Sequence, residues 1–212
     1  MVIPSTLQNL IASISRAVYR ARYPILFTAI VYSLSVSIGI IMVHAGNKFA
    51  LNYRDQLVNQ SVQSNPASVA YVQGRNFEAA LWDFAGNLVL GAFPKTISGF
   101  SVLLVYPMVI QQGWVGGIVS VQGDHSSRLS EPHSAIYYLL TLLLQLVPYS
   151  LAIGAGVNAG IALFRTPPHY EGQRWLGIFP KEALRDVARI YLLVIPLFLI
   201  ASLWEFLSSW NL

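Results

Sequence analysis

Five polar side chains in the apolar part of the sequence have the types and spacing to form a polar pathway through a membrane. Asp83 and Asn87 lie four residues apart, so they share one face if the stretch WDFAGNLVLGAF is helical. Gln145, Asn158 and Glu205 interrupt later apolar runs. Lipid does not accept carboxyl and amide groups, so these residues must face another helix or a water-filled cavity. Together they are the candidate functional polar seam.

Two interpretations of these polar residues remain open. Glu205 lies about one turn from the end of the last apolar run, where it is a candidate proton or ion site or a partner for Arg128 or His133. The structural alternative is hydrogen bonding between helices, which contributes about 1 kcal/mol per contact and needs no substrate. If the seam residues fall on different faces, only the structural alternative survives.

Other chemistry has little support in the sequence. His44 and His133 stand at the margins of apolar runs, whereas a haem or chlorophyll pair needs facing histidines inside the bilayer, so we expect no cofactor. The adjacent Asp124, His125 and Ser126 do not form a triad, because triad members come from separated positions with defined geometry. No phosphate-binding glycine motif occurs, and the chain has no cysteine. We therefore expect neither a metal site nor an enzyme.

The composition is that of an integral membrane protein. Of the 212 residues, 55% are hydrophobic and 10% are charged, against about 25% charged in a typical soluble domain. Mean hydropathy is +0.54. The net charge of +4 is not accompanied by a basic cluster interleaved with aromatic residues, so nucleic-acid binding is not expected. We expect one all-α domain, residues 1–212, with membrane lipids as its surroundings.

Five apolar segments predict about five transmembrane helices. They cover residues 24–45, 78–93, 97–121, 134–164 and 187–210. Residues 1–22 have an apolar face followed by arginines and predict an N-terminal interfacial amphipathic helix. The second segment is short and polar, so a re-entrant loop is its alternative. Pro94 and Lys95 are expected in the connector before the third segment, and Pro107 is expected to kink that segment.

Glycines in the third and fourth segments predict close helix packing. Small residues let helix backbones approach each other in a membrane. The candidates for helix packing are Gly113, Gly117, Gly156 and Gly160. Exposed faces of this kind would suit other integral membrane proteins or a homo-oligomer.

The distribution of Lys and Arg predicts the orientation. Cytoplasmic loops carry an excess of these residues. With five crossings, nine of the 13 fall on the side of the N-terminus, namely Arg16, Arg20, Arg22, Lys95, Arg165, Arg174, Lys181, Arg185 and Arg189. We expect a multi-pass protein of the cytoplasmic (inner) membrane, with the N-terminus in the cytoplasm and the C-terminus outside. A re-entrant second segment would reverse every later loop and remove this asymmetry.

The second half of the sequence resembles the stage II sporulation protein M family. The resemblance covers roughly residues 82–210 and rests on Pro132-His133 before the fourth segment and on the closing IPLFLIASLWEF, with Ala201 and Glu205. Family members commonly have Asn-Gly in the third segment, where this chain has Gln112-Gly113. The resemblance implies a five-span inner-membrane protein without known catalysis, whose sporulation member is a membrane scaffold.

Two functions follow from these observations. The first is a non-catalytic membrane subunit or scaffold that assembles with other membrane proteins through its Gly-rich helix faces. The alternative is a transporter or channel-like protein in which Asp83, Asn87, Gln145 and Glu205 line a common pathway. A membrane enzyme or redox subunit ranks third, because few histidines and carboxylates are available to converge.

Overall fold

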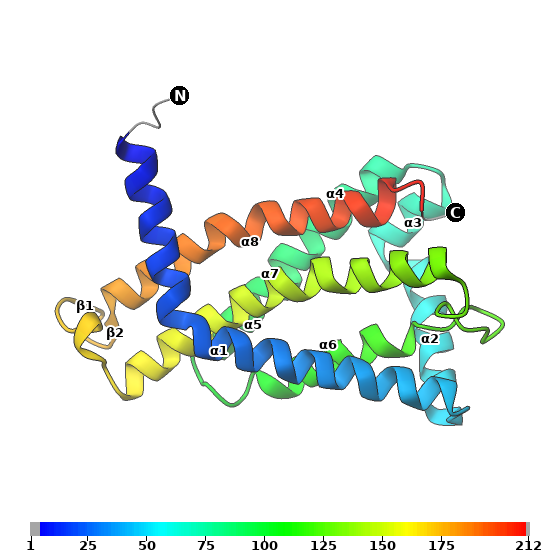
Figure 1. Ribbon diagram of the computed structural model, residues 1–212, viewed down its shortest axis with the longest axis horizontal. Helices are drawn as coiled ribbons and strands as arrows, with labels where there is room; N and C mark the ends of the chain where they lie inside the picture. The colour runs from blue at the N-terminus through cyan, green and yellow to red at the C-terminus, as the bar shows by residue number, and fades with distance from the viewer. Residues whose placement is uncertain (1–4, 211–212) are drawn as a thin grey trace.

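The computed structural model describes residues 5–210, with side-chain positions from residue 7, and shows a bundle of α-helices with a small hairpin at one end (Figure 1). Residues 1–4 of the expected interfacial helix lie outside the described part. The elements are α1 (Ser5–His44), α2 (Lys48–Ser64), α3 (Pro66–Val72), α4 (Asn76–Ala85), the π-helix η1 (Gly86–Ala92), α5 (Phe93–Gly99), α6 (Tyr106–Ile118), α7 (Pro132–Phe164), the 3₁₀-helix η2 (Pro168–Tyr170), β1 (Arg174–Trp175), β2 (Phe179–Pro180) and α8 (Lys181–Leu207).

Among the described residues, three helices are long and apolar enough to cross a membrane. They are α1 from Leu7, α7 and α8. These helices correspond to the expected segments 24–45, 134–164 and 187–210, although each begins earlier in the chain. Many large apolar side chains on them are exposed, as is expected of helices that can cross a membrane.

The expected interfacial helix and the first expected span form one continuous helix. The helix runs from Ser5 to His44 without a break. Figure 1 shows that the N-terminal part of α1 nevertheless runs at a steep angle to the rest. Pro24 accounts for the bend, because proline has no N–H to donate to the preceding turn and its ring crowds that turn. The sequence pattern thus predicted a break where the structure has a kink.

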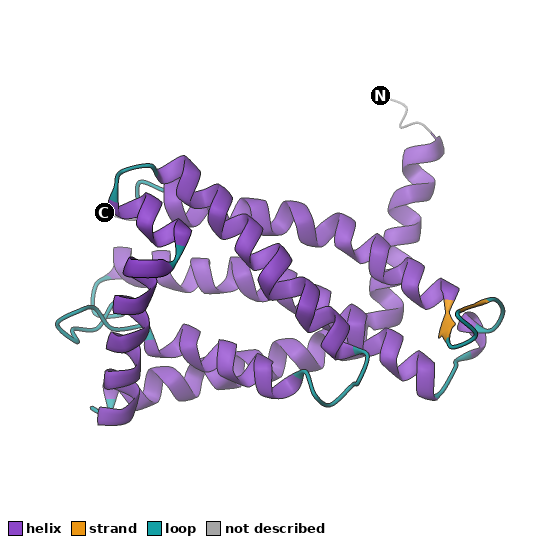
Figure 2. Cartoon of the chain, turned by 180° about the vertical axis from the view of Figure 1, so that it is seen from behind, coloured by secondary structure: helices purple, strands orange, loops and turns teal. Residues whose placement is uncertain are grey.

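The second expected span is helical from 76 to 99. The three consecutive segments α4, η1 and α5 contain 10, 7 and 7 residues, which together extend roughly 35 Å. Seen from behind, this run crosses the outside of the bundle (Figure 2). The connector expected at Pro94 and Lys95 was wrong, because both residues lie inside α5. Pro94 stands where η1 passes into α5, and its missing N–H interrupts the helical hydrogen bonds there without ending the helical run.

The expected span 97–121 is not a single helix. The chain leaves α5 after Gly99, turns through residues 100–105 with a positive φ of 63° at Val102, and begins α6 at Tyr106. Pro107 starts this helix, and the kink expected there is absent from α6. With 13 residues, α6 is about 20 Å long, shorter than the roughly 30 Å hydrocarbon core. The turn and α6 together return the chain along the bundle.

Helices α2 and α3 cover one end of the bundle. Asn47 caps α2 by accepting a hydrogen bond from the Ala50 amide at 3.1 Å, and Asn65 caps α3 through the Ala67 amide at 2.9 Å. The hairpin β1–β2 lies at the opposite end (Figure 1). Lys95, which the charge count placed in a loop, belongs to α5.

Glycines bring the helix backbones together inside the chain. A Cβ atom at Gly117 would lie 2.2 Å from the Val36 carbonyl oxygen of α1, and one at Gly113 would lie 2.6 Å from that of Tyr32. On α7, a Cβ at Gly156 would lie 2.1 Å from the Thr96 carbonyl oxygen, and one at Gly160 would lie 2.5 Å from that of Phe100. The four glycines therefore seat α6 on α1 and α7 on α5, and helices of the same chain already occupy their faces.

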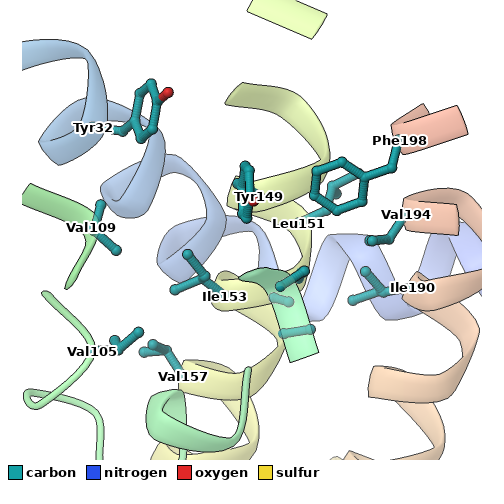
Figure 3. Close-up of a cluster of buried hydrophobic side chains, with 14 of the residues drawn as sticks. Tyr32, Val105, Val109, Tyr149, Leu151, Ile153, Val157, Ile190, Val194 and Phe198 are labelled. Atoms are coloured by element: carbon teal, nitrogen blue, oxygen red, sulfur yellow. The ribbon is translucent and has the colours of Figure 1, made fainter. Parts of the chain in front are cut away.

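A buried apolar cluster fills the middle of the bundle. Tyr149 and Phe198 meet edge to face with ring centroids 4.8 Å apart, and aliphatic side chains of α6, α7 and α8 surround them (Figure 3). Phe198 is fully buried. This cluster fixes the side of α7 and α8 that carries the polar seam.

Candidate functional site: a polar seam between two cavities

Asp83 and Asn87 form the first half of the seam. Asn87 donates from Nδ2 to Asp83 Oδ2 at 2.8 Å, one helical turn away. Ser202 of α8 donates from Oγ to the same oxygen at 2.7 Å, and Tyr149 of α7 donates from its hydroxyl to Asn87 Oδ1 at 2.7 Å. Gly91 leaves the space that the Tyr149 hydroxyl occupies, because a Cβ there would lie 2.3 Å from it. Three parts of the chain thus converge on one carboxylate.

Gln145 and Glu205 form the second half. Gln145 Nε2 donates to Glu205 Oε2 at 2.7 Å, which joins α7 to α8. Glu205 follows Ser202 by three residues on α8, so the two side chains lie on one face about one turn apart. The carboxyl groups of Asp83 and Glu205 therefore lie near each other along α8. Four of the five predicted seam residues come together.

Asn158 lies in a different cluster. Its Nδ2 donates to the Tyr170 hydroxyl at 2.7 Å, and that hydroxyl donates to Asp186 Oδ2 at 2.9 Å. Arg20 and Arg189 pair with Asp186 at 3.2 and 2.7 Å. This group ties α1 and the hairpin end to α8. Asn158 was wrongly assigned to the seam because its place in the apolar run does not reveal which end of the bundle it faces.

Two cavities reach the seam from different sides. The first has a volume of about 510 Å³, lies under α2 and α3, and is lined by Gln145 and Glu205 together with Arg54 and Arg128. The second has a volume of about 430 Å³, lies between the α2–α3 junction and the outer face of α4 and η1, and is lined by Asp83 and Asn87 among other residues. Both cavities therefore reach the seam at the end of the bundle that α2 and α3 cover.

Asn87 lies in the π-helix η1, where the helix is wider than an α-helix. A π-turn lengthens the hydrogen-bonded ring and displaces side chains from their usual helical positions; such turns are frequent at functional sites. On the other side of Tyr149, the ammonium group of Lys95 lies 4.8 Å from the centroid of the tyrosine ring. Polar contacts thus continue from Asp83 through Asn87 and Tyr149 to a cation in α5.

An ion pair stands at the outer margin of the first cavity. Arg54 of α2 is buried and pairs with Asp55 at 2.8 Å, and Asp55 Oδ2 lies 2.9 Å from His125 Nε2. The hydrogen bond from Arg54 and then that with His125 hold the pKa of Asp55 below its ordinary value. This group links α2 to the loop before α7, so it fastens the cover of the cavity.

The residues on which the family resemblance rests take structural positions. Pro132 opens α7 in its first turn. The His133 ring stacks on Trp210 with centroids 4.7 Å apart, while His44 Nε2 lies 2.7 Å from Ser127 Oγ. The two histidines that were weighed as cofactor ligands thus have separate neighbours. Ala201 is buried in α8 beside Ser202.

Three parts of the site were not predicted from the sequence. Ser202 was not assigned to Asp83, although the spacing of Ser202 and Glu205 on one helical face was a usable signal. Tyr149 was interpreted only as an interruption of an apolar run. Arg54 was not placed in the site, because nothing in the sequence shows that α2 folds back over the bundle.

Comparisons with known proteins give no match: no protein-family model, no curated protein and no solved structure is similar to the chain. The function must therefore be argued from the geometry of the site.

Proposed function

We propose that this chain is a multi-pass membrane protein of the transporter or channel-like class, which moves protons or small ions along the seam of Asp83, Asn87, Gln145 and Glu205. The observation that carries the proposal is the convergence of these residues from α4, η1, α7 and α8. Scattered positions would have left hydrogen bonding between helices as their whole role. Intramembrane carboxyl groups beside hydrogen-bonding amides are the groups from which proton relays are built.

The proposal includes five crossings of an inner membrane with the N-terminus in the cytoplasm. The helical run 76–99 is long enough for the second crossing, and the turn with α6 supplies the third. Irregular backbone is tolerated at membrane depth where protein covers it. In this turn Val105 is fully buried, whereas Leu103 and Leu104 are 74% and 73% exposed. The N-terminal part of α1, which is bent away from the bundle and carries exposed Leu7 and Ile11, lies in the membrane interface.

The chemistry of the seam suits a mobile proton. Two carboxyl groups held near one face of α8 disfavour double ionisation, so the seam is suited to hold a single proton. The Asn87 amide and the hydroxyls of Ser202 and Tyr149 reorient to follow that proton, because each has both donor and acceptor capacity. The two cavities supply approaches to the seam from the end of the bundle that α2 and α3 cover.

Proton flux into proteoliposomes tests the proposal. The purified protein is reconstituted into phosphatidylcholine and phosphatidylglycerol liposomes with a pH-sensitive dye inside, and a valinomycin-clamped potassium gradient supplies the driving force. We expect the wild-type protein to conduct protons, and Asp83→Asn and Glu205→Gln to slow the flux at least about tenfold. Glu131→Gln, at an exposed position before α7, is the matched control and should conduct like wild type. Flux no greater than in empty liposomes would overturn the proposal.

The scaffold function has less support. Its basis in the sequence was that Gly-rich faces are available to partner helices, but α1 and α5 already cover Gly113, Gly117, Gly156 and Gly160. A scaffold would have to bind partners through other faces, such as the exposed apolar face of α1. Purification from native membranes in mild detergent, followed by mass spectrometry, separates the two functions, since a stoichiometric set of other membrane proteins would favour the scaffold.

The relationship to the stage II sporulation protein M family is also a proposal. Its support is the position of the motif residues at corresponding ends of two neighbouring helices. Pro132 and His133 begin α7, and Ala201 and Glu205 lie near the end of α8. The Tyr137 hydroxyl joins these ends by donating to the Glu205 carbonyl oxygen at 2.6 Å.

A further inference from the structure

The cavity under α2 and α3 is larger, and has more charged and polar side chains on its wall, than the conduction of a proton requires. Its volume of about 510 Å³ falls in the range of sites for small organic ligands, roughly 300–1,000 Å³. Six helices and the loop before α7 contribute to its walls. A proton or a metal ion would leave most of this space unfilled.

Three charged side chains line the cavity. Arg54 comes from α2, Arg128 from the loop before α7, and Glu205 from α8. Asp55 already balances Arg54 at 2.8 Å, whereas none of the ion pairs formed by residues 7–210 includes Arg128. The Nε atoms of both arginines are buried without a hydrogen-bond partner among the described residues. The cavity thus contains two guanidinium groups and the carboxylate of Glu205, which lies close enough to Arg128 to interact with it electrostatically.

The neighbours of Glu205 are suited to an ammonium group. Gln145 uses its Nε2 on Glu205, which leaves its oxygen for another donor. Gln112, another lining residue, has a buried Oε1 without a hydrogen-bond partner among the described residues. An ammonium group has three N–H donors and no acceptor, so it can be shared by a carboxylate and amide oxygens. Phosphate and carboxylate oxygens instead suit the planar fork of arginine.

The rest of the wall is apolar, and this surface continues to the rim. Val58, Val115 and Leu142 line the interior, and Val62 and Val72 of the covering helices are 44% and 67% exposed. A water-soluble ligand gains nothing from an apolar rim. A ligand with a hydrocarbon chain buries it there, at about 25 cal/mol per Å² of apolar surface removed from water.

We propose that the cavity binds the headgroup of an aminophospholipid such as phosphatidylethanolamine, with the phosphate on Arg128 and the primary ammonium on Glu205. The acyl chains then leave past Val62 and Val72. Phosphatidylcholine has the same phosphate but no N–H donor, and phosphatidylglycerol has no cation for Glu205. The lipid site stands on the cavity and its charges alone, so it does not depend on proton conduction.

Lipid titrations followed by native mass spectrometry test this assignment. Delipidated wild-type protein in detergent is titrated with phosphatidylethanolamine, phosphatidylcholine and phosphatidylglycerol that have identical acyl chains. We expect phosphatidylethanolamine to bind at least about tenfold more tightly than the other two, which corresponds to one charge-assisted interaction. Equal affinity for the three lipids, or the tightest binding by phosphatidylglycerol, would overturn the proposal. This arm needs no variant, so a misfolded mutant cannot obscure it.

Variants then separate the two halves of the site. Glu205→Gln should remove the preference for phosphatidylethanolamine over phosphatidylcholine, while Arg128→Gln should weaken the binding of both. Arg75→Gln is the matched control, since Arg75 lies at the same end of the bundle, pairs with Glu78 and does not line the cavity. An equal loss in Arg75→Gln and Arg128→Gln would show general attraction to the membrane surface and overturn the site.

A soluble headgroup identifies the source of the ligand. O-phosphoethanolamine carries the same phosphate and ammonium but no acyl chain. We expect it to compete with phosphatidylethanolamine only weakly, because it buries no apolar surface at the rim. If it binds as tightly as the lipid, the cavity belongs to a soluble zwitterion and the lipid assignment falls. Because no arm measures flux, failure here leaves the conduction proposal untouched, and the reverse also holds.

Discussion

Ser202 donates a hydrogen bond to Asp83 across 119 residues of sequence, and this 2.7 Å contact joins α8 to α4. This contact connects the pair of Asp83 and Asn87 to the pair of Gln145 and Glu205. Glu205 follows Ser202 by about one turn of α8 and accepts a hydrogen bond from Gln145. Without the serine hydroxyl, Asp83 would retain only Asn87 among the hydrogen bonds observed to its carboxylate. The geometry therefore gives Ser202 a role that its small size does not suggest.

Replacing Ser202 with alanine should lower the stability modestly. The substitution deletes one hydrogen bond between helices, for which we expect a loss of about 1 kcal/mol. Ser37→Ala serves as the control, since the Ser37 hydroxyl is exposed and bonds only the Ser33 carbonyl oxygen of its own helix. Thermal unfolding in detergent measures both. A melting temperature for Ser202→Ala equal to that of Ser37→Ala would show that the contact contributes nothing.

Alanine at Gly156 should be strongly destabilising. Its Cβ would lie 2.1 Å from the Thr96 carbonyl oxygen, so α7 and α5 must separate, at a cost of about 1–3 kcal/mol or more. Gly86→Ala is the opposite case, because no atom lies within 4 Å of the place that its methyl group would take, and alanine favours a helix. Detergent melts should therefore show a large decrease for the first variant and none for the second. Equal behaviour would contradict the close packing of α5 and α7.

The sequence predicted the helices whose apolar runs are long and contain only isolated polar residues. Segments 134–164 and 187–210 correspond closely to α7 and α8, because nothing in these runs offers an alternative to a helix. The prediction of a connector at Pro94 and Lys95 was wrong for a physical reason. The proline lies within the helical run 76–99 without ending it, and the actual turn at 100–105 contains no proline or glycine to mark it.

The seam was predictable in part. Asp83 and Asn87 follow from helical spacing, which is a local property. The grouping of Gln145 with Glu205, and the exclusion of Asn158, depend on how α7 and α8 are rotated against each other. Tertiary packing sets that rotation, so spacing within one helix cannot reveal it. The same holds for Arg54, which reaches the cavity only because α2 folds over the bundle.

Replacing Asp186 with asparagine should weaken the opposite end of the bundle. Asp186 is buried and receives Arg20 at 3.2 Å, Arg189 at 2.7 Å and the Tyr170 hydroxyl at 2.9 Å. Loss of its charge leaves two guanidinium groups without this partner, and we expect a cost of about 2–4 kcal/mol. Glu171→Gln, at an exposed site on the same end, should leave the melting temperature unchanged. An unchanged Asp186→Asn would show that water replaces the carboxylate fully.

The ion pair that fastens α2 should make stability depend on acid pH. Arg54 and then His125 hold the pKa of Asp55 below 3.8 in the folded protein, while the unfolded chain has the ordinary value. A carboxyl group with a lowered native pKa stabilises the fold above the ordinary pKa, and this contribution disappears as the pH falls through the native value. Asp55 is 37% exposed at its side chain, so the effect should stay below about 1 kcal/mol.

Asp55→Asn isolates that contribution, because asparagine does not titrate. We expect the wild-type protein to melt at a higher temperature than the variant at pH 5, and the two melting temperatures to converge as the pH falls from about 4 to below 3. Glu171→Gln, in the loop at the other end of the bundle, should not show such a converging difference. A gap between wild type and Asp55→Asn that persists at the lowest pH would mean that Asp55 acts through packing and not through its charge. In that case α2 would be held over the cavity by its apolar contacts with α6, such as the stacking of Phe49 on Trp114, whose ring centroids lie 5.9 Å apart.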